Sequence, residues 1–332
     1  MHNRRVILKS RPLGVAQAEN FAIEVNAVPA LAEGEILVRN EFLSVEPAMR
    51  GWIADTAGYA TPVAVGAVMR SLAVGRVVES RHPLYAAGEA LVGWFGWQDF
   101  AKVGPEAVVR RVTETDLPLS LALGVLGING VTALLALERI GAPRAGETVL
   151  VSTAAGSVGS AVGQIAKILG CRTIGIAGGA EKKRACVEDY QYDFALDYRA
   201  DDLDREIGRL CPEGVNVYFD NTAGEISDIA HKHLAIGARI VVCGTASIAS
   251  WEDWPTGPRI ERRLLVKRAR MEGFIIFDHM DAYAGAVDRL ANWVREGVLR
   301  YREDILEGID ACPDALAGLY RGENLGKRLI RL

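Results

Sequence analysis

A glycine-containing turn that joins an apolar strand to a helix most limits how this chain can fold. The apolar segment Thr148–Ser152 runs into Thr153-Ala154-Ala155-Gly156-Ser157-Val158-Gly159, and a helical pattern follows. In the G-x-G-x-x-G form of such a turn, Ala154 takes the first glycine position, Gly156 lets backbone approach a pyrophosphate, and Gly159 allows close helix packing. The amino end of the helix also offers amide N–H groups to phosphates. A tight turn without a ligand is the alternative.

Apolar segments recur after this first strand, with helical-length segments between them. The strand candidates are Thr148–Ser152, Thr173–Ala177, Asn216–Phe219, Arg239–Cys243 and Gly273–Ile276. Such fully apolar strands are typical of a parallel sheet that helices cover on both faces. In this setting the glycine turn predicts dinucleotide binding.

The rest of the chain follows another pattern. Residues 6–112 consist of short alternating or apolar runs, such as Glu35–Arg39 and Gly75–Glu79, between Gly and Pro turns, which indicates β structure. A helical segment at about 280–294 and a tail at 299–332 follow the sheet, and the tail has too little apolar mass to be a domain. We therefore predict an α/β, Rossmann-type doubly wound sheet domain over 122–297 and a mainly β domain formed by 1–121 and 298–332.

The end of the second strand indicates which cofactor is bound. An NAD enzyme usually places Asp or Glu there to bind the ribose 2′-hydroxyl, but this chain has Ala177-Gly178-Gly179. Glu181 and then Lys182-Lys183-Arg184 follow, and these cations could pair with a 2′-phosphate. A solvated helix start is the alternative. The pattern favours NADP(H).

Charge and cysteine content exclude several classes of protein. Lys+Arg 38 against Asp+Glu 42 gives a net charge of −4, so no field of one sign is available to bind nucleic acid or an anionic membrane.

The five cysteines are scattered and form no Cys-x-x-Cys pair, which predicts a reducing, cytoplasmic location. The apolar run after the basic N-terminus stops at Lys9, so we expect no export signal. The uncharged segment Leu117–Leu137 is interrupted by Pro118, Asn129 and glycines, so we expect an interior connection between the domains and no membrane span.

Metal ligands are not evident in the sequence. No cysteine precedes Cys171. His231 and His233 stand at i, i+2 in a predicted helix and would point away from each other, so we expect surface residues and no metal pair. No Ser-His-Asp order or nucleophile elbow is present. Together with the glycine turn, this predicts hydride chemistry without a metal.

Matching segments occur in order along nearly the whole chain: Phe42–Gly51, Gly66–Arg70, Leu126–Ala133, Ala154–Gly159, Gly163–Lys167, Phe219–Asn221, Val242–Gly244, Met271–Phe274 and Asn324–Lys327. In these segments the sequence resembles the zinc-independent medium-chain dehydrogenase/reductase family. Within that family it is similar to the NADPH-dependent double-bond reductases of the prostaglandin (leukotriene), alkenal and curcumin type. The resemblance implies that the mainly β domain is a GroES-like catalytic domain.

The resemblance also implies a set of cofactor-binding residues. The pyrophosphate would lie over Ala155, Gly156, Ser157 and Val158, beside Gly159, and Lys182 with Tyr198 would hold the 2′-phosphate. The ribose and nicotinamide would be surrounded by Asn221, Cys243, Gly244, Thr245, Phe274, Ile275, Ile276 and Asn324. Other roles stay open at this point: Tyr198 as a strand cap, Asn221 as a turn residue and Phe274 as core.

Two departures from the family affect the expected substrate pocket. Pro47-Ala48-Met49-Arg50 replaces the frequent Pro-Tyr-Met-Arg, and Ala249-Ser250-Trp251-Glu252 stands where many members carry a Tyr-Asn pair. We therefore expect a more apolar pocket near the nicotinamide, without a phenol donor at these positions. Tyr59 is the candidate catalytic residue and, with Trp52, a candidate to line the cleft. Loop packing is the alternative for both.

The resemblance implies NADPH-dependent reduction of the C=C bond of α,β-unsaturated ketones and aldehydes by hydride transfer to the β-carbon. Negative charge then grows on the carbonyl oxygen, which needs hydrogen-bond donors. The resemblance points to the nicotinamide ribose 2′-hydroxyl as one donor, with Tyr59 or water as a further candidate. The expected partners are a small enone or enal and a second copy of the chain in a homodimer. A quinone oxidoreductase of the same fold and an NADPH-binding protein without catalysis are the alternatives.

Overall fold

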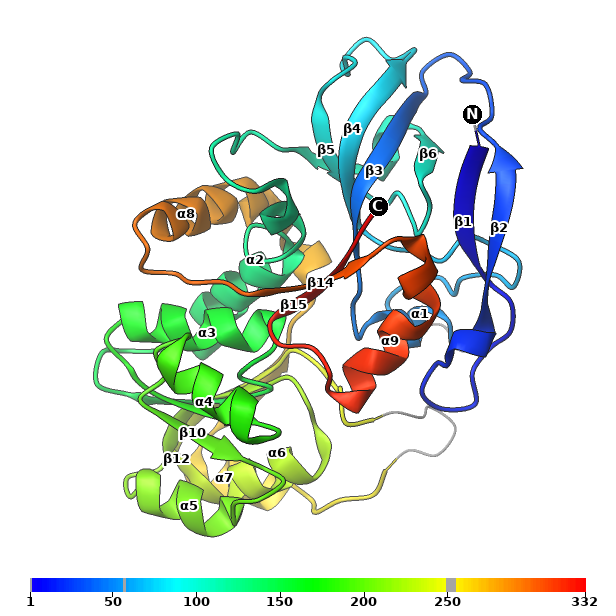
Figure 1. Cartoon of the computed structure of the whole chain (residues 1–332). Helices are drawn as coiled ribbons and strands as arrows, with labels where there is room; N and C mark the ends of the chain where they lie inside the picture. Colours follow the sequence, from blue (N-terminus) through cyan, green and yellow to red (C-terminus); the bar gives the residue numbers. More distant parts are fainter. Residues whose placement is uncertain (1, 56–57, 249–254) are drawn as a thin grey trace. The chain divides into compact units, whose positions relative to one another are not determined.

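The computed structural model describes residues 2–55, 58–248 and 255–332 (Figure 1). The described residues form two compact units: the β unit, which comprises residues up to Leu123 with Glu303–Leu332, and the α/β unit, which comprises Gly124–Ile248 with 255–302. Compactness alone does not make a unit an independently folding domain. The domain limits at 121/122 and 297/298 therefore stay a prediction.

The α/β unit is built on a six-stranded sheet in the order β10-β9-β8-β11-β12-β13. Its strands are β8 (Thr148–Ser152), β9 (Arg172–Ala177), β10 (Phe194–Asp197), β11 (Val215–Asp220), β12 (Leu234–Val242) and β13 (Arg270–Gly273). All neighbouring strands are parallel. The strand order reverses between β8 and β11, which is the arrangement of a doubly wound nucleotide-binding sheet. The predicted Rossmann-type fold is confirmed.

Two strand predictions need correction. The strand predicted at Gly273–Ile276 is wrong: β13 ends at Gly273, and its four residues are exposed. Residues 274–276 are apolar for another reason: Phe274 and Ile276 are buried in the segment that follows β13. The prediction also missed β10, the other edge strand, whose four residues give too short a pattern to detect.

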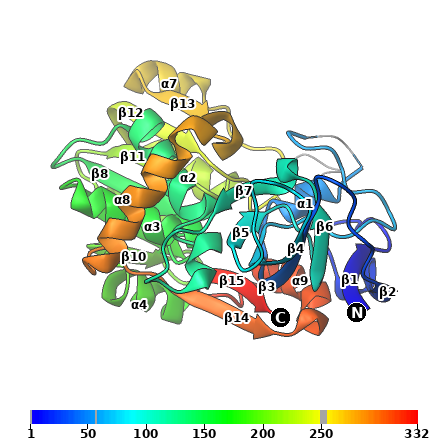
Figure 2. The ribbon, with the colours of Figure 1, turned by 90° about the horizontal axis from the view of Figure 1, so that it is seen from above.

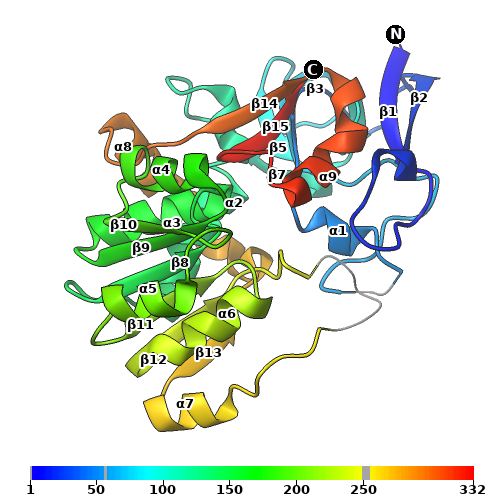
Figure 3. The ribbon, with the colours of Figure 1, turned by 60° about the horizontal axis from the view of Figure 1, so that its bottom comes forward.

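Helices cover both faces of this sheet. They are α2 (Ile128–Ala136), the π-helical η4 (Leu137–Gly141), α3 (Ser157–Ile168), α4 (Ala180–Glu188), α5 (Leu203–Leu210), α6 (Gly224–Ala230), η5 (His231–His233), α7 (Glu261–Lys267), η6 (Ile276–Ala282) and α8 (Tyr283–Arg295). α2, α3 and α8 lie side by side (Figure 2), while α5 and α6 lie together in Figure 3. Leu203, Ile207 and Ala230 of α5 and α6 pack on Leu150 and Ile174 of the sheet.

Tyr192 fixes α3 to the sheet. A Cβ on Gly163 of α3 would lie 2.1 Å from the Tyr192 ring, so this glycine makes room for it. The Tyr192 hydroxyl donates to the Gly159 carbonyl at 2.6 Å, one turn earlier on the same helix. The close packing predicted for Gly159 is therefore present, and at Gly163 an aromatic ring occupies the space.

The β unit contains a seven-stranded sheet and a separate hairpin. Its strands are β1 (His2–Leu8), β2 (Phe21–Ala27), β3 (Ile36–Ser44), β4 (Ala73–Ser80), β5 (Ala90–Gly93), β6 (Phe100–Val103), β7 (Val108–Arg111), β14 (Glu303–Glu307) and β15 (Lys327–Arg331). The order is β14-β15-β3-β4-β5-β7, with β6 on β3, and β1 pairs with β2. The C-terminal tail thus adds β14 and β15 to the first region's sheet, as the sequence predicts.

Short helices complete the β unit: η1 (Ala18–Asn20), α1 (Met49–Trp52), η2 (Pro105–Ala107), η3 (Leu119–Leu123), η7 (Ile309–Ala311) and α9 (Cys312–Arg321). The uncharged segment Leu117–Leu137 contributes η3 and α2, and most of its residues are buried. Among the described residues, no helix has the length and apolar character needed to cross a bilayer.

Candidate active site

The sheet gathers most of the predicted cofactor residues at one edge. Because all six strands are parallel, their carboxyl ends lie on the same side of the sheet, and each predicted group follows one of these ends. Ala155–Gly159 follow β8, Lys182 follows β9, Tyr198 follows β10, Asn221 follows β11, Cys243–Thr245 follow β12 and Phe274–Ile276 follow β13. Tyr59 and Asn324 belong to the β unit.

The turn after β8 has the shape that a pyrophosphate site needs. Gly156 is the N-cap of α3, and Thr153 adopts a left-handed conformation with φ 53°. A Cβ on Gly159 would lie 2.2 Å from the Thr153 carbonyl oxygen, so only glycine lets the helix start this close to the strand. The first-turn amides of α3 have no intrahelical acceptor and can bind phosphate oxygens. These residues fit a dinucleotide.

Ala154 stands at the first glycine position of the motif, and the structure shows why alanine is tolerated there. The neighbouring strand β9 carries Gly175 opposite it, and a Cβ on Gly175 would lie 2.7 Å from the Ala154 Cβ. Gly175 therefore provides the space that the alanine methyl group occupies.

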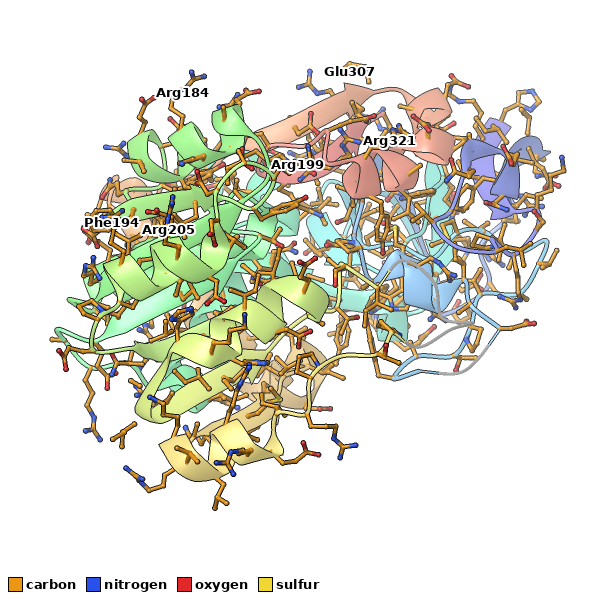
Figure 4. All side chains as sticks on the ribbon, turned by 90° about the horizontal axis from the view of Figure 1, so that it is seen from below. Arg184, Phe194, Arg199, Arg205, Glu307 and Arg321 are labelled. Atoms are coloured by element: carbon orange, nitrogen blue, oxygen red, sulfur yellow. The ribbon has the colours of Figure 1, made fainter. Side chains whose placement is uncertain are left out.

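The cations after β9 have different surroundings. Lys183 pairs with Asp201 at 2.6 Å and, mainly by this hydrogen bond, lowers the pKa of that carboxyl. Arg184 lies 3.7 Å from Glu188 and projects outward from α4, apart from Arg199 on the turn after β10 (Figure 4). Lys183 and Arg184 thus each have an acidic partner close by.

Asn221 is tied to the end of β8. Its side-chain amide donates to the Ser152 carbonyl at 2.7 Å, and its backbone N–H donates to Ser152 Oγ at 2.8 Å. This residue joins the two strands between which the strand order reverses. Its position at that switch point suits a ligand contact.

The buried Asp220 holds the turn that follows β11. Its Oδ1 accepts from the backbone N–H groups of Thr222 and Ala223, both at 2.9 Å, and its Oδ2 accepts from Ser227 Oγ at 2.6 Å. Ala223 has φ 58° and ψ −163°, a conformation that non-glycine residues keep only under restraint. Asp220 supplies that restraint, and the sequence analysis missed it because the signal is one acid at a strand end.

The residues after β12 and β13 include one thiol and one stacked ring. Burial raises the pKa of the Cys243 thiol to about 12, so this group stays protonated near neutral pH. Phe274 stacks on His279 with ring centroids 4.6 Å apart and is buried. The Phe274 side chain therefore packs on His279, and its contact with the cofactor stays a prediction.

In the β unit, Trp52 holds Tyr59. Trp52 is buried and packs edge-on against Trp94 at 5.6 Å. Its indole N–H donates to the Tyr59 hydroxyl at 3.2 Å, and its carbonyl accepts from the Val63 N–H at 2.7 Å. Tyr59 itself is 55% exposed. The sequence placed Trp52 in this loop region, but it could not show that the indole holds the phenol.

A buried ionic group lies beside Asn324, whose side chain donates to the Gly326 carbonyl at 2.9 Å. Lys327 Nζ donates to Glu46 Oε1 at 2.8 Å and to the Val45 carbonyl at 2.9 Å. Lys327 thereby ties the Asn324–Lys327 segment to the chain just before Pro47. Burial raises the pKa of the neighbouring Glu303.

The histidine prediction is partly wrong, because His231 is buried. It lies edge-on to Tyr218 with ring centroids 5.9 Å apart, and burial lowers its pKa. His233 Nε2 lies 2.6 Å from Asp204 Oδ1. Among the residues described, no three His, Cys, Asp or Glu side chains are grouped so that they could hold a metal ion. Of the two departures from the family pattern, the segment Ala249–Glu252 lies outside the described residues. Ala48, at the other departure, is half-buried directly before α1.

Comparisons with known proteins agree with this arrangement. Residues 4–111 match a family model described as the N-terminal domain of oxidoreductase, and residues 157–292 match one described as zinc-binding dehydrogenase. The chain is 40% identical to an NADPH-dependent curcumin reductase of Escherichia coli (strain K12), over 99% of this chain and 97% of the relative. It is 33% identical to a 2-alkenal reductase (NADP(+)-dependent) of Nicotiana tabacum, over 99% and 97%. The structure of CurA from Vibrio vulnificus in complex with NADPH has a TM-score of 0.93 and 38% identity, covering 99% of this chain and 98% of that one.

Proposed function

This chain belongs to the medium-chain dehydrogenase/reductase family, in its alkenal and curcumin reductase type, and from that premise we propose that it reduces the C=C bond of α,β-unsaturated ketones or aldehydes with NADPH. The observation that carries the proposal is the 40% identity to a curcumin reductase over 99% of the chain. The turn at Gly156 and Gly159, which lets α3 begin close to β8 so that its first-turn amides can bind phosphate, supports it independently of that identity.

The α/β unit would bind the cofactor with the residues at the carboxyl edge of its sheet. The amides at the start of α3 would hold the pyrophosphate, and Lys182 with Tyr198 would hold the 2′-phosphate. Asn221, Cys243–Thr245, Phe274–Ile276 and Asn324 would contact the ribose and nicotinamide. When bound, NADPH supplies the hydride that adds to the β-carbon of the substrate.

Tyr59 would stabilise the negative charge that develops on the substrate's carbonyl oxygen. The Trp52 indole can only donate, so in their 3.2 Å hydrogen bond the Tyr59 oxygen is the acceptor. This bond does not use the phenol proton, and we propose that Tyr59 donates it to the substrate carbonyl. The enolate that results must then take up one proton at its α-carbon, and solvent can supply this proton.

We infer a reaction without metal, although one family model has a zinc-binding description. The support is the donor set: among the described residues, His, Cys, Asp and Glu form no group of three that could hold an ion. Dialysis against a chelator should leave the rate unchanged. A loss of activity that zinc restores would contradict this inference.

The test of the function is a panel of enones and enals followed by NADPH absorbance, with NADH and quinones in parallel. We expect turnover of at least some enones and a preference for NADPH. Quinone turnover without enone turnover would favour a quinone oxidoreductase. NADPH binding without turnover of either class would indicate a protein whose catalysis has lapsed.

We also propose a homodimer in the cytoplasm. β13 is an edge strand with four exposed residues, and its backbone could pair with a second copy. The preceding helix α7 presents Leu265, 76% exposed, and Val266, 54% exposed, to solvent.

The proposed cytoplasmic location has separate support. The five cysteines are all free, which supports a reducing location.

A further inference from the structure

Gly178, directly after β9, lies against the ring of Tyr198. A Cβ built on Gly178 would lie 2.6 Å from Tyr198 Cε1 and 2.9 Å from both Cζ and the phenol oxygen. These distances are shorter than any ordinary contact, so the ring occupies the space that a side chain at 178 would need. Tyr198 as a whole is nevertheless 43% exposed, which leaves part of its surface open to a ligand.

Tyr198 is held in this place by the turns around it. Its backbone N–H donates to the Ala177 carbonyl at 3.0 Å. The buried carboxylate of Asp197 accepts from the Gly179 N–H at 2.8 Å and from the Arg199 N–H at 3.0 Å. Asp197 thus joins the turn after β9 to the turn after β10, so the Tyr198 backbone cannot move away without the loss of these bonds, and a side chain at 178 would have to displace the ring by rotation.

The backbone at 178 does not itself require glycine. Gly179 has a φ of +94°, which disfavours other residues, whereas the φ of Gly178 lies outside that left-handed range. The Tyr198 ring is therefore the obstacle to a side chain at 178. This is also the end of the second strand, where NAD enzymes place the carboxylate that binds the ribose 2′-hydroxyl.

We propose that Gly178 is a specificity-determining residue, because its missing side chain seats Tyr198 beside the 2′-phosphate subsite and the same contact excludes a carboxylate of the NAD type. The inference rests on the proposed function, in which Tyr198 and Lys182 bind the 2′-phosphate. Selectivity for NADPH over NADH then depends on the interlocking contact between Gly178 and Tyr198 as well as on the charge of Lys182. Acceptance of NADH requires both members of the pair to change together.

The first experiment measures dissociation constants for NADPH and NADH by calorimetry. We expect Gly178→Ala to weaken NADPH binding about tenfold, as the loss of one hydrogen bond to a charged group would, with a smaller effect on NADH. Tyr198→Ala should do the same, and the double variant should be no weaker than Tyr198→Ala alone. Gly285→Ala in α8, where a Cβ meets no atom within 4 Å, is the matched control and should bind like the wild type.

Unchanged NADPH affinity in Gly178→Ala would overturn the interlock. If that variant does not fold, addition of Tyr198→Ala must restore folding, because it removes the clash. A double variant that stays unfolded would contradict the proposal.

The second experiment introduces the carboxylate. Gly178→Asp alone should weaken the binding of NADPH without strengthening the binding of NADH. The double variant Gly178→Asp with Tyr198→Ala should bind NADH more tightly than the wild type does. A gain for NADH with Tyr198 in place would overturn the interlock. Failure of the proposed function gives a different result, since the wild-type chain would then bind no NADPH.

Discussion

The three cations after β9 show how residues of the same charge differ by their neighbours. Lys183 and Arg184 are paired with Asp201 and Glu188 at 2.6 and 3.7 Å. Burial raises the pKa of the Cys186 thiol to about 12, and Lys182, one turn earlier on α4, offsets part of this rise. Lys182 is the cation that the family resemblance assigns to the 2′-phosphate, and this role stays a prediction.

Substitution of Lys182 tests this assignment. We expect Lys182→Ala to reduce the ratio of kcat/KM for NADPH over NADH by roughly 10- to 100-fold, because one charge-assisted contact to the phosphate is lost. Arg184→Ala is the control, since its side chain projects outward, and it should leave the ratio unchanged. An unchanged ratio in Lys182→Ala would count against the phosphate role.

Glu303 gives a prediction about pH. Its buried carboxyl has a raised pKa, so the folded chain binds this proton more tightly than the unfolded chain does. The stability it contributes is present below the ordinary glutamate pKa and is lost as pH rises through the raised value. We expect Glu303→Gln to remove this loss of stability toward neutral pH, as measured by urea unfolding at a series of pH values.

The control for this pH effect lies on the same strand. Glu307 is exposed, as Figure 4 shows at the outer side of β14, so Glu307→Gln should keep the wild-type pH profile. If Glu303→Gln has the wild-type profile as well, the carboxyl is ionised in the folded chain and its burial is not costly.

At the scale of elements, α3 depends on the notch at Gly163 that the Tyr192 ring fills. Helical glycines usually cost stability, but here the Tyr192 hydroxyl also satisfies the Gly159 carbonyl at 2.6 Å. The sequence pattern identifies the small residues on this helix face. It does not identify Tyr192 as the partner, because that contact joins segments nearly thirty residues apart.

The same substitution on two helices tests this contact. Gly163→Ala should lower the free energy of unfolding by about 1–3 kcal/mol, because the added methyl group overlaps the Tyr192 ring. Gly285→Ala in α8 faces open space and should be neutral or slightly stabilising, by up to about 0.5–1 kcal/mol. Equal effects of the two substitutions in urea unfolding would show that the ring moves aside freely.

At the scale of the whole molecule, the sequence predicts the fold class, the tail strands in the β unit and most of the parallel sheet. Hydrophobic pattern determines these features, since a buried strand must be apolar on both faces. It failed at Gly273–Ile276 and at β10, where edge position and short length weaken the pattern. Contacts such as Gly178 with Tyr198, or Asp220 with the turn after β11, need the third dimension. The roles of the individual site residues stay predictions.

The homodimer prediction also belongs to this scale. Two substitutions on α7, Leu265→Glu and Val266→Glu, should convert a particle of twice the chain mass into a monomer, because charge is placed on the proposed contact. Light scattering after size exclusion measures the mass. Leu84→Glu, at a position 65% exposed in the β unit, is the control. A dimer that survives both α7 substitutions would place the contact elsewhere.

The methyl group of Ala154 and the bare α-carbon of Gly175 have a consequence for how such chains are recognised. The turn after β8 and the neighbouring strand β9 share one space: the methyl group of Ala154 departs from the glycine of the motif, and Gly175 on β9 leaves room for it. A chain with these two residues exchanged, glycine at 154 and alanine at 175, should build the same turn, whereas alanine at both should not. A fingerprint written along a single stretch of letters misses this pairing, and one written across the register of the sheet would include it.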